Sequence, residues 1–130
     1  MMPALHGDEW RGVLSDDWHV EEPSWNDVKQ AIERLDAKTF TIVTIQGPGE
    51  QHLAVGGGVG RYVVYATFDN CEFWNLVAAT ESDSAVLLNV GGQEGDYAAS
   101  QIVDLDRVQL AARAFFERLQ LEPSLRWEKQ

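Results

Sequence analysis

The fold of this chain is decided by residues 40–68, which read FTIVTIQGPGEQHLAVGGGVGRYVVYATF. Runs of β-branched and aromatic residues alternate there with short glycine-containing turns, and this pattern is typical of strands. The pattern continues along the chain, and the predicted strands are 40–45, 52–56, 61–68, 72–79 and 85–90, with 101–103 as a candidate sixth. Because connections of a few residues favour antiparallel neighbours, we predict an antiparallel meander of about five or six strands.

Two segments with helical periodicity accompany this predicted sheet. Residues 24–37 place apolar side chains along one helical face, and Ser24 with Asp27 resembles a capping box at the start. Residues 105–119 show the same periodicity behind Asp104, which is a favourable N-cap residue. The predicted fold class is therefore α+β, with two amphipathic helices packed on the antiparallel sheet.

Length and composition indicate a single domain over residues 1–130. Cys71 is the only cysteine of the chain, so neither an intrachain disulfide nor a four-thiolate metal site can form. The N-terminus lacks the features of a secretory signal, and the sequence has no apolar run long enough to span a membrane. We therefore expect a cytoplasmic protein without a membrane partner.

The charge of the chain is strongly negative and unevenly placed. There are 21 acidic and 10 basic residues, which gives a formal net charge of −11. Residues 1–22 hold six carboxylates and one arginine, and we expect an acidic, irregular or short-strand segment that Trp10 and Trp18 anchor on the body. The negative electrostatic potential of such a chain disfavours nucleic acid as a partner and favours a basic protein. Selection for solubility alone explains the same excess of acidic residues.

The glycine clusters do not have the pattern of a nucleotide site. A GxGxxG match at residues 56–61 fails because Arg61 occupies the last position, and no helix follows directly. We therefore interpret these glycines as backbone features of turns and bulges. The residues that we expect to be structural are Trp25, Gly56, Gly57, Gly91, Gly92 and Trp127, the last of them in a tail that folds back on the core.

No group of residues in the sequence indicates catalysis. His6, His19 and His52 lack the spacing of a metal site or a catalytic pair, and we interpret them as solvated surface residues. Cys71 is followed by Glu72, whose charge opposes formation of a reactive thiolate. The sequence therefore predicts a protein that is not an enzyme and that uses neither a cofactor nor a metal ion.

Carboxylate pairs recur in the predicted loops, with aromatic residues close to them. Tryptophan and tyrosine are favoured anchors of interfaces, and acidic loop tips suit a basic partner, although a merely solvated face has the same composition. The candidate partner-binding residues are Asp16, Asp17, Trp18, Glu21, Glu22, Glu81, Asp83, Glu94, Asp96 and Tyr97.

The order of short motifs resembles one protein family over roughly residues 10–127. The motifs are Pro23-Ser24-Trp25, Ala31-Ile32, Leu35-Asp36, Leu53 to Gly57, Val90 to Gln93, Val103 to Leu105, Ala111 to Phe116 and Pro123 to Trp127. Their combination is similar to the first-numbered family of polymorphic-toxin immunity proteins, which accompany secreted bacterial deaminase toxins. The family has no catalytic motif, and its toxin-contacting residues vary, so the resemblance assigns no site residue here.

The resemblance implies that the chain binds and neutralises a cognate toxin, a basic protein that we expect to be a nucleic-acid deaminase. An acidic inhibitor can occupy the positively charged substrate groove of such an enzyme. The alternative is a small α+β ligand-binding or enzymatic domain with its site at the glycine-rich loops. The sequence leaves both a monomer and a homodimer open.

Overall fold

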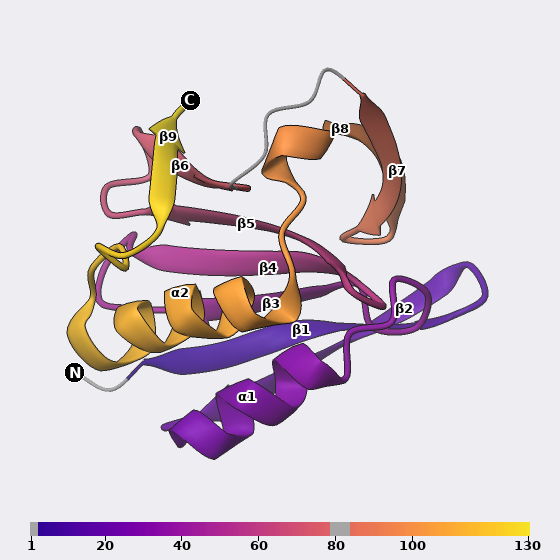
Figure 1. Ribbon diagram of the computed structural model, residues 1–130. Helices are drawn as coiled ribbons and strands as arrows, with labels where there is room; N and C mark the ends of the chain where they lie inside the picture. Colours follow the sequence, from indigo (N-terminus) through magenta and orange to yellow (C-terminus); the bar gives the residue numbers. More distant parts are fainter. Residues whose placement is uncertain (1–2, 79–83) are drawn as a thin grey trace.

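The computed structural model describes residues 3–78 and 84–130 (Figure 1). The α-helices in this part of the chain are α1 (Trp25–Glu33) and α2 (Leu105–Arg118). The strands are β1 (Ala4–Arg11), β2 (Leu14–Glu21), β3 (Ile42–Gln46), β4 (His52–Gly58), β5 (Arg61–Thr67), β6 (Phe73–Val77), β7 (Ala85–Val90), β8 (Gln93–Ala98) and β9 (Arg126–Lys129). The fold is α+β, as predicted, with more strands than the five or six expected.

Seven strands form one antiparallel sheet in the order β2-β1-β3-β4-β5-β6-β9. The predicted meander is confirmed from β3 to β6, because each of these strands pairs with the next in the chain. The prediction that β7 continues the meander is wrong, since β7 pairs with β8 in a separate two-stranded sheet. We expected a loop in place of β8, but Gly91 and Gly92, with φ of 65° and 81°, make the two-residue turn of a tight hairpin.

The N-terminal segment is a regular hairpin of two strands, where an irregular or short-strand segment was expected from its composition. β1 and β2 pair over eight residues each, and β1 also pairs with β3, so the hairpin widens the sheet at its edge. Leu5, Trp18 and Val20 pack against the core, while strand alternation places Asp17 on the opposite face. Gly7 lies opposite Trp18, and an added Cβ would come within 2.6 Å of the indole ring. Glycine therefore makes room for this tryptophan.

Both helices begin where the sequence predicts. Ser24 and Asp27 form a reciprocal capping box at α1, and Asp104 caps α2. α1 ends before the predicted residue 37 because the Asp36 carboxylate accepts hydrogen bonds from three following backbone amides and turns the chain away. Burial raises the pKa of Asp36, but these hydrogen bonds outweigh it and leave the pKa below its ordinary value.

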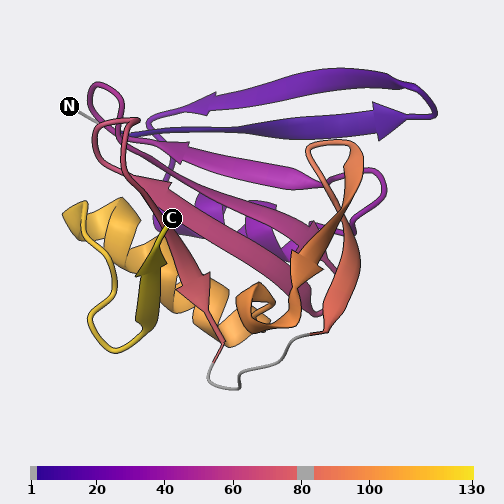
Figure 2. The ribbon, with the colours of Figure 1, turned by 90° about the horizontal axis from the view of Figure 1, so that it is seen from above.

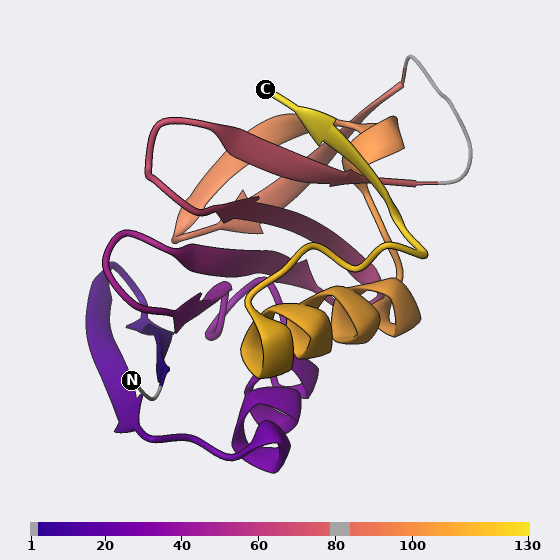
Figure 3. The same ribbon diagram turned by 90° about the vertical axis from the view of Figure 1, so that its left-hand side faces the viewer.

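Both helices cover the same face of the large sheet (Figures 1 and 3). Ile32 of α1 and Phe115 of α2 are fully buried there, in one cluster with Leu53 of β4. The β7–β8 hairpin lies against the other face, where a Cβ on Gly56 would come within 2.3 Å of Val90. Glycine at position 56 therefore permits the two sheets to pack closely.

The C-terminal segments complete the edges of this arrangement. The tail folds back as predicted: β9 pairs with β6, and half-buried Trp127 packs against the core cluster. The candidate strand at 101–103 is not formed. A 3₁₀ turn, η1 (Ala99–Gln101), occupies its start, and Val103 makes an isolated bridge with Tyr62 of β5.

Candidate functional site

The distal half of the β1–β2 hairpin projects beyond the rest of the large sheet (Figures 1 and 2). β1 pairs with β3 from Ala4 to Gly7, whereas its pairing with β2 continues to Arg11. The tip is apolar and open to solvent, since Val13 is 92% and Leu14 74% exposed. The hairpin therefore offers a small apolar surface at its end.

Negative charge follows this hairpin along β2. We call β1, its turn, β2 and Glu22 the acidic hairpin, and its exposed carboxylates are Asp16, Asp17, Glu21 and Glu22. The Arg11 guanidinium lies 4.0 Å from the carboxylates of both Glu9 and Asp16. Because exposed ion pairs of this length are weak, the negative charge of the hairpin stays largely uncompensated.

One further carboxylate, that of Asp8, is buried and holds the hairpin on the body. It accepts hydrogen bonds from the backbone amides of Thr41 (2.8 Å) and Ile42 (3.1 Å) and from the Thr41 hydroxyl. The Trp10 indole nitrogen donates to it at 2.7 Å, and the Gly92 amide donates to the Thr41 hydroxyl at 2.9 Å. Asp8 thus joins β1, the residues before β3 and the β7–β8 turn. Sequence reasoning counted this residue only within the acidic excess.

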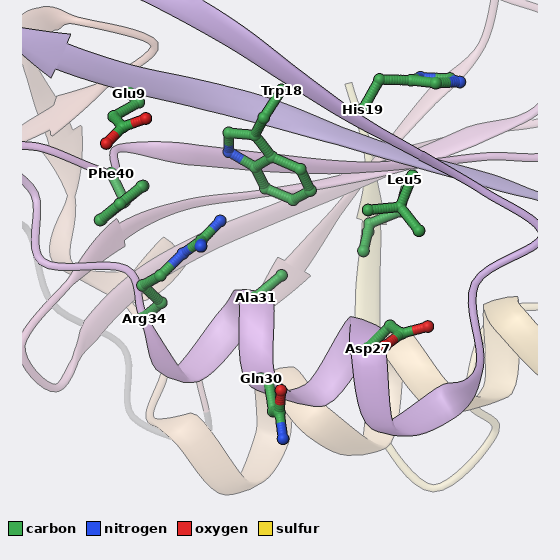
Figure 4. Close-up of a pocket in the computed structure, with 10 residues that line it drawn as sticks. Leu5, Glu9, Trp18, His19, Asp27, Gln30, Ala31, Arg34 and Phe40 are labelled. Carbon is green, nitrogen blue, oxygen red and sulfur yellow. The ribbon is translucent and has the colours of Figure 1, made fainter.

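A groove of about 390 Å³ lies between the acidic hairpin and α1 (Figure 4). We call it the Trp18 groove, after the tryptophan that projects into it from β2. The Arg34 guanidinium lies 5.0 Å from the centre of the Trp18 ring and 4.2 Å from that of Phe40, within cation–π range. Glu9 and Asp27 also line the groove. Its aromatic surface and charges of both signs suit a polar peptide segment.

The other predicted partner-binding residues lie elsewhere. The described ones are Glu94, Asp96 and Tyr97 on β8, while Glu81 and Asp83 lie outside the described residues. Tyr97 lines a cleft of about 210 Å³ together with Tyr65 of β5. The candidates among the described residues therefore fall on the acidic hairpin and the β7–β8 hairpin, which meet where Gly92 lies against the Trp10 ring.

Most of the residues expected to be structural lie at close packing contacts, whereas an added Cβ on Gly91 would meet nothing within 4 Å. The Trp25 ring of α1 is 6.2 Å from the Phe116 ring of α2, between their centres. Gly57 has a φ of 101°, and an added Cβ would come within 2.4 Å of the Arg61 carbonyl oxygen. Val90 lies equally close to Gly56. The space beside these two glycines, where a ligand of the glycine-rich segment would have to bind, is therefore filled by the protein itself.

Two of the three histidines are less solvated than expected, since His6 and His52 are half-buried and His19 is exposed. Cys71 is exposed in the turn between β5 and β6. Over residues 3–78 and 84–130, no three His, Cys, Asp or Glu side chains are arranged to hold a metal ion. Nor does this part of the chain contain a helix long and apolar enough to cross a membrane.

Residues 16–129 match the protein family described as Immunity protein Imm1. This chain belongs to the Imm1 family. The match spans most of the sequence and confirms the resemblance that the short motifs indicate. A comparison with curated proteins finds no match.

Membership of the Imm1 family supports a toxin-neutralising immunity function, in which the chain binds a cognate toxin. The Imm1 match begins at Asp16, inside β2, and runs through the helices to β9. The match includes most of β2 and all of α1, the helix that lines the Trp18 groove. β1 and the exposed tip residues Val13 and Leu14 precede the match. The family region and the projecting apolar tip are therefore separate parts of the chain.

Proposed function

We propose that this Imm1 protein neutralises its toxin by placing the acidic hairpin in or over the toxin's basic substrate site. The observation that carries this proposal is the projection of an apolar tip bordered by uncompensated carboxylates. In this proposal the toxin is a nucleic-acid deaminase, the class that the family resemblance implies. The protein acts in the cytoplasm, by binding and without catalysis.

Electrostatic complementarity supports the acidic hairpin as the binding element. A toxin that acts on nucleic acid needs a cationic groove to hold phosphate groups. Exposed carboxylates such as Asp16 and Asp17 present negative charge to that groove in place of phosphates. Such charge accelerates encounter between the partners and orients them before contact.

Apolar and aromatic contacts supply the binding energy that charge alone does not. Exposed Val13 and Leu14 lose contact with water when a partner covers the tip. Trp18 faces the neighbouring groove, and tryptophan is a preferred residue at the energetic centre of interfaces. A toxin segment that follows β2 therefore meets the tip, the carboxylates and the Trp18 groove in succession.

The test compares two charge-reversal variants of the same size. Asp16→Lys with Asp17→Lys changes the acidic hairpin, and Glu94→Lys with Asp96→Lys changes β8; each pair shifts the net charge by about +4 at neutral pH. We expect the first pair to slow association with the toxin by about tenfold or more and to flatten its dependence on salt. The second pair should stay close to wild type. Stopped-flow association rates over a range of salt concentrations measure both.

Three results would contradict the proposal. An association rate of the wild type that does not change with salt removes the electrostatic part. Equal slowing by both pairs shows that net charge matters and the position of the carboxylates does not. Slowing by the β8 pair alone moves the binding element to the β7–β8 hairpin. In each case, survival of cells that co-express toxin and variant provides a second readout.

A further inference from the structure

The sheet face opposite the helices carries all three histidines of the chain. His6 of β1 lies directly opposite His19 of β2 in the antiparallel register. The neighbour of His6 in the chain, Leu5, faces the helices, so alternation turns His6 to the other side. The same reasoning applies to His52 of β4, because buried Leu53 belongs to the core cluster. Three strands therefore contribute one imidazole each to one face.

The β7–β8 hairpin covers a different part of this face. Its side chains Val90 and Leu88 lie over Gly56 and Gly57, toward the far end of β4 from His52. The end that carries the histidines lies beyond these contacts. His19 is exposed there, and His6 and His52 are half-buried.

Aromatic side chains extend the histidine end of the sheet toward β6. His52 Nε2 lies 3.2 Å from the Tyr65 hydroxyl oxygen, and the two rings meet edge to face with centres 5.5 Å apart. The Phe73 ring follows, 5.8 Å from that of Tyr65. We call this surface, made of His6, His19, His52, Tyr65 and Phe73, the histidine face.

The histidine face is continuous with the acidic hairpin. His19 stands on β2 between Asp17 and Glu21, which share its side of the strand, and its Nε2 lies 3.5 Å from the Glu21 carboxylate. A basic partner that binds the carboxylates of β2 therefore covers His19 and reaches His6 directly across the pair. The continuity of the two surfaces and the charge of β2 therefore indicate that one basic partner covers both the acidic hairpin and the histidine face.

We propose that the histidine face is part of the interface with the basic toxin, and that protonation of its histidines weakens the complex. This inference rests on the proposed function. An uncharged imidazole can be covered by a cationic partner at little electrostatic cost, whereas a protonated one cannot. When all three are protonated, the formal net charge rises from −11 to −8, and the new cations lie beside the carboxylates that attract the toxin.

The groups around His6 determine how easily the face is protonated. Burial lowers the pKa of His6, neighbouring His19 and His52 lower it further, and Asp17 acts in the opposite direction. Asp8, two residues along β1, is held by its own hydrogen bonds, and β3 contributes uncharged Thr44 at the pairing position. Around His52, the ring contacts are the Tyr65 hydroxyl and the Glu50 carbonyl oxygen. When a cationic toxin covers this face, desolvation and charge repulsion make the protonated form of these imidazoles still less favourable.

The experiment measures toxin affinity at about pH 7.5 and about pH 5.5, on either side of the ordinary histidine pKa of about 6.5. The probe is a catalytically inactive form of the toxin domain encoded beside this chain. For the wild type, we expect the Kd to rise at the lower pH, by up to about tenfold for each histidine whose pKa the toxin lowers by one unit. His6→Gln, His19→Gln and His52→Gln combined should remove most of this rise. Titration of the toxin itself is common to both proteins and cancels in the comparison.

Two further measurements keep the outcome decisive. His19→Gln alone changes an exposed residue, so it tests the inference even if the triple variant does not fold; it should remove part of the pH dependence. Calorimetry in buffers of different ionisation enthalpy should show protons released on binding near pH 6 or below, as linkage requires. A wild-type Kd that does not change with pH, or equal pH dependence in wild type and His variants, overturns the inference. The proposed function fails separately, if Asp16→Lys with Asp17→Lys leaves association unchanged, and absence of any complex overturns both.

Discussion

The acidic hairpin and α2 with its tail carry their charges in opposite ways. The ion pairs near α2 and the tail include Arg107–Asp104 at 2.8 Å, Arg113–Glu117 at 3.1 Å, Arg118–Glu122 at 3.5 Å and Lys129–Glu72 at 2.8 Å. In the hairpin, Arg11 is the one arginine for six carboxylates, and its two contacts are 4.0 Å long. The comparison shows that the hairpin alone carries a net charge of −5 out of the −11 of the chain, whereas acids and bases balance over residues 101–130.

The two regions also differ in what holds them in place. α2 buries a continuous stripe of apolar residues that ends in Phe115, which is fully buried. The distal hairpin lies beyond the end of its pairing with β3. It is attached there by the hydrogen bonds that Asp8 accepts from Thr41 and by the bond from the Trp10 amide to the Thr39 carbonyl oxygen. The distal part of the hairpin, residues 9–17, can therefore be changed in position or in chemistry without dismantling the helix-covered core, to which Leu5, Trp18 and Val20 belong or pack.

The largest expected effect that separates the two regions comes from Asp8→Ala. This change removes the acceptor for the Thr41 and Ile42 amides and the Trp10 indole, and buried donors without partners are costly. We expect a loss of about 3 kcal/mol in the free energy of unfolding, measured by urea denaturation. Hydrogen exchange should accelerate in β1, β2 and the β7–β8 turn while amides of α2 keep their relative protection.

Asp8→Asn is the matched control, because it keeps one carbonyl oxygen as an acceptor and the same shape. It should lose clearly less stability than Asp8→Ala. If Asp8→Ala is as stable as the wild type, the buried carboxylate does not attach the hairpin. If α2 and the hairpin lose protection to the same extent, the two regions are not separable.

The second effect is on binding. Val13→Ser with Leu14→Ser makes the hairpin tip polar, and because both residues are exposed, the free energy of unfolding should change by no more than about 0.5 kcal/mol. Toxin affinity should fall by about tenfold, since apolar area that the toxin would cover is lost. Isothermal titration calorimetry measures this affinity directly.

Leu110→Ser provides the control for the tip variant on α2, where Leu110 is 50% exposed. It removes a leucine from the surface of α2, where the charged side chains form ion pairs, and it should leave toxin affinity unchanged. Equal losses for the tip and for Leu110 would show that the toxin contacts α2 as well. Unchanged affinity of the tip variant would exclude the tip from the interface.

Parts of the fold that rest on local sequence signals were predictable. Ser24 and Asp104 mark the helix starts because capping is a contact between near neighbours, and the alternating runs of β3 to β6 have short turns that leave little choice of pairing. Acidic residues obscured β1 and β2, although Trp10 and Trp18 do anchor this segment on the body: Trp18 packs against the core cluster, and the Trp10 ring lies against Gly92. The separate pairing of β7 depends on contacts with β4 and Trp10, which no local pattern encodes.

The candidate site was less predictable than the fold, and distance along the chain is the reason. Asp8 is bonded to residues 33 and 34 positions away, so its burial has no local signal. The Trp18 groove requires β2, α1 and Phe40 to converge, and the sequence named only Trp18 among its lining residues as a candidate for partner binding. Once residues 1–22 are known to form a hairpin, the position of Val13 and Leu14 at its turn predicts that these two apolar residues are exposed.

The smallest expected effect concerns the pH dependence of folding and separates His6 in the hairpin from the rest of the chain. The pKa of His6 is lowered in the folded protein, first by burial and then by His19. Between its folded pKa and the unfolded value of about 6.5, the unfolded chain binds more protons at this residue, so stability falls as the pH drops through that window. His6→Gln should therefore make the urea midpoint less sensitive to acid than in the wild type. His19→Gln should reduce the sensitivity partly, because it removes one of the imidazoles that lower the His6 pKa. A His6→Gln midpoint that follows the wild type from about pH 7.5 to about pH 5 would show that His6 is protonated as readily in the folded chain as in the unfolded one.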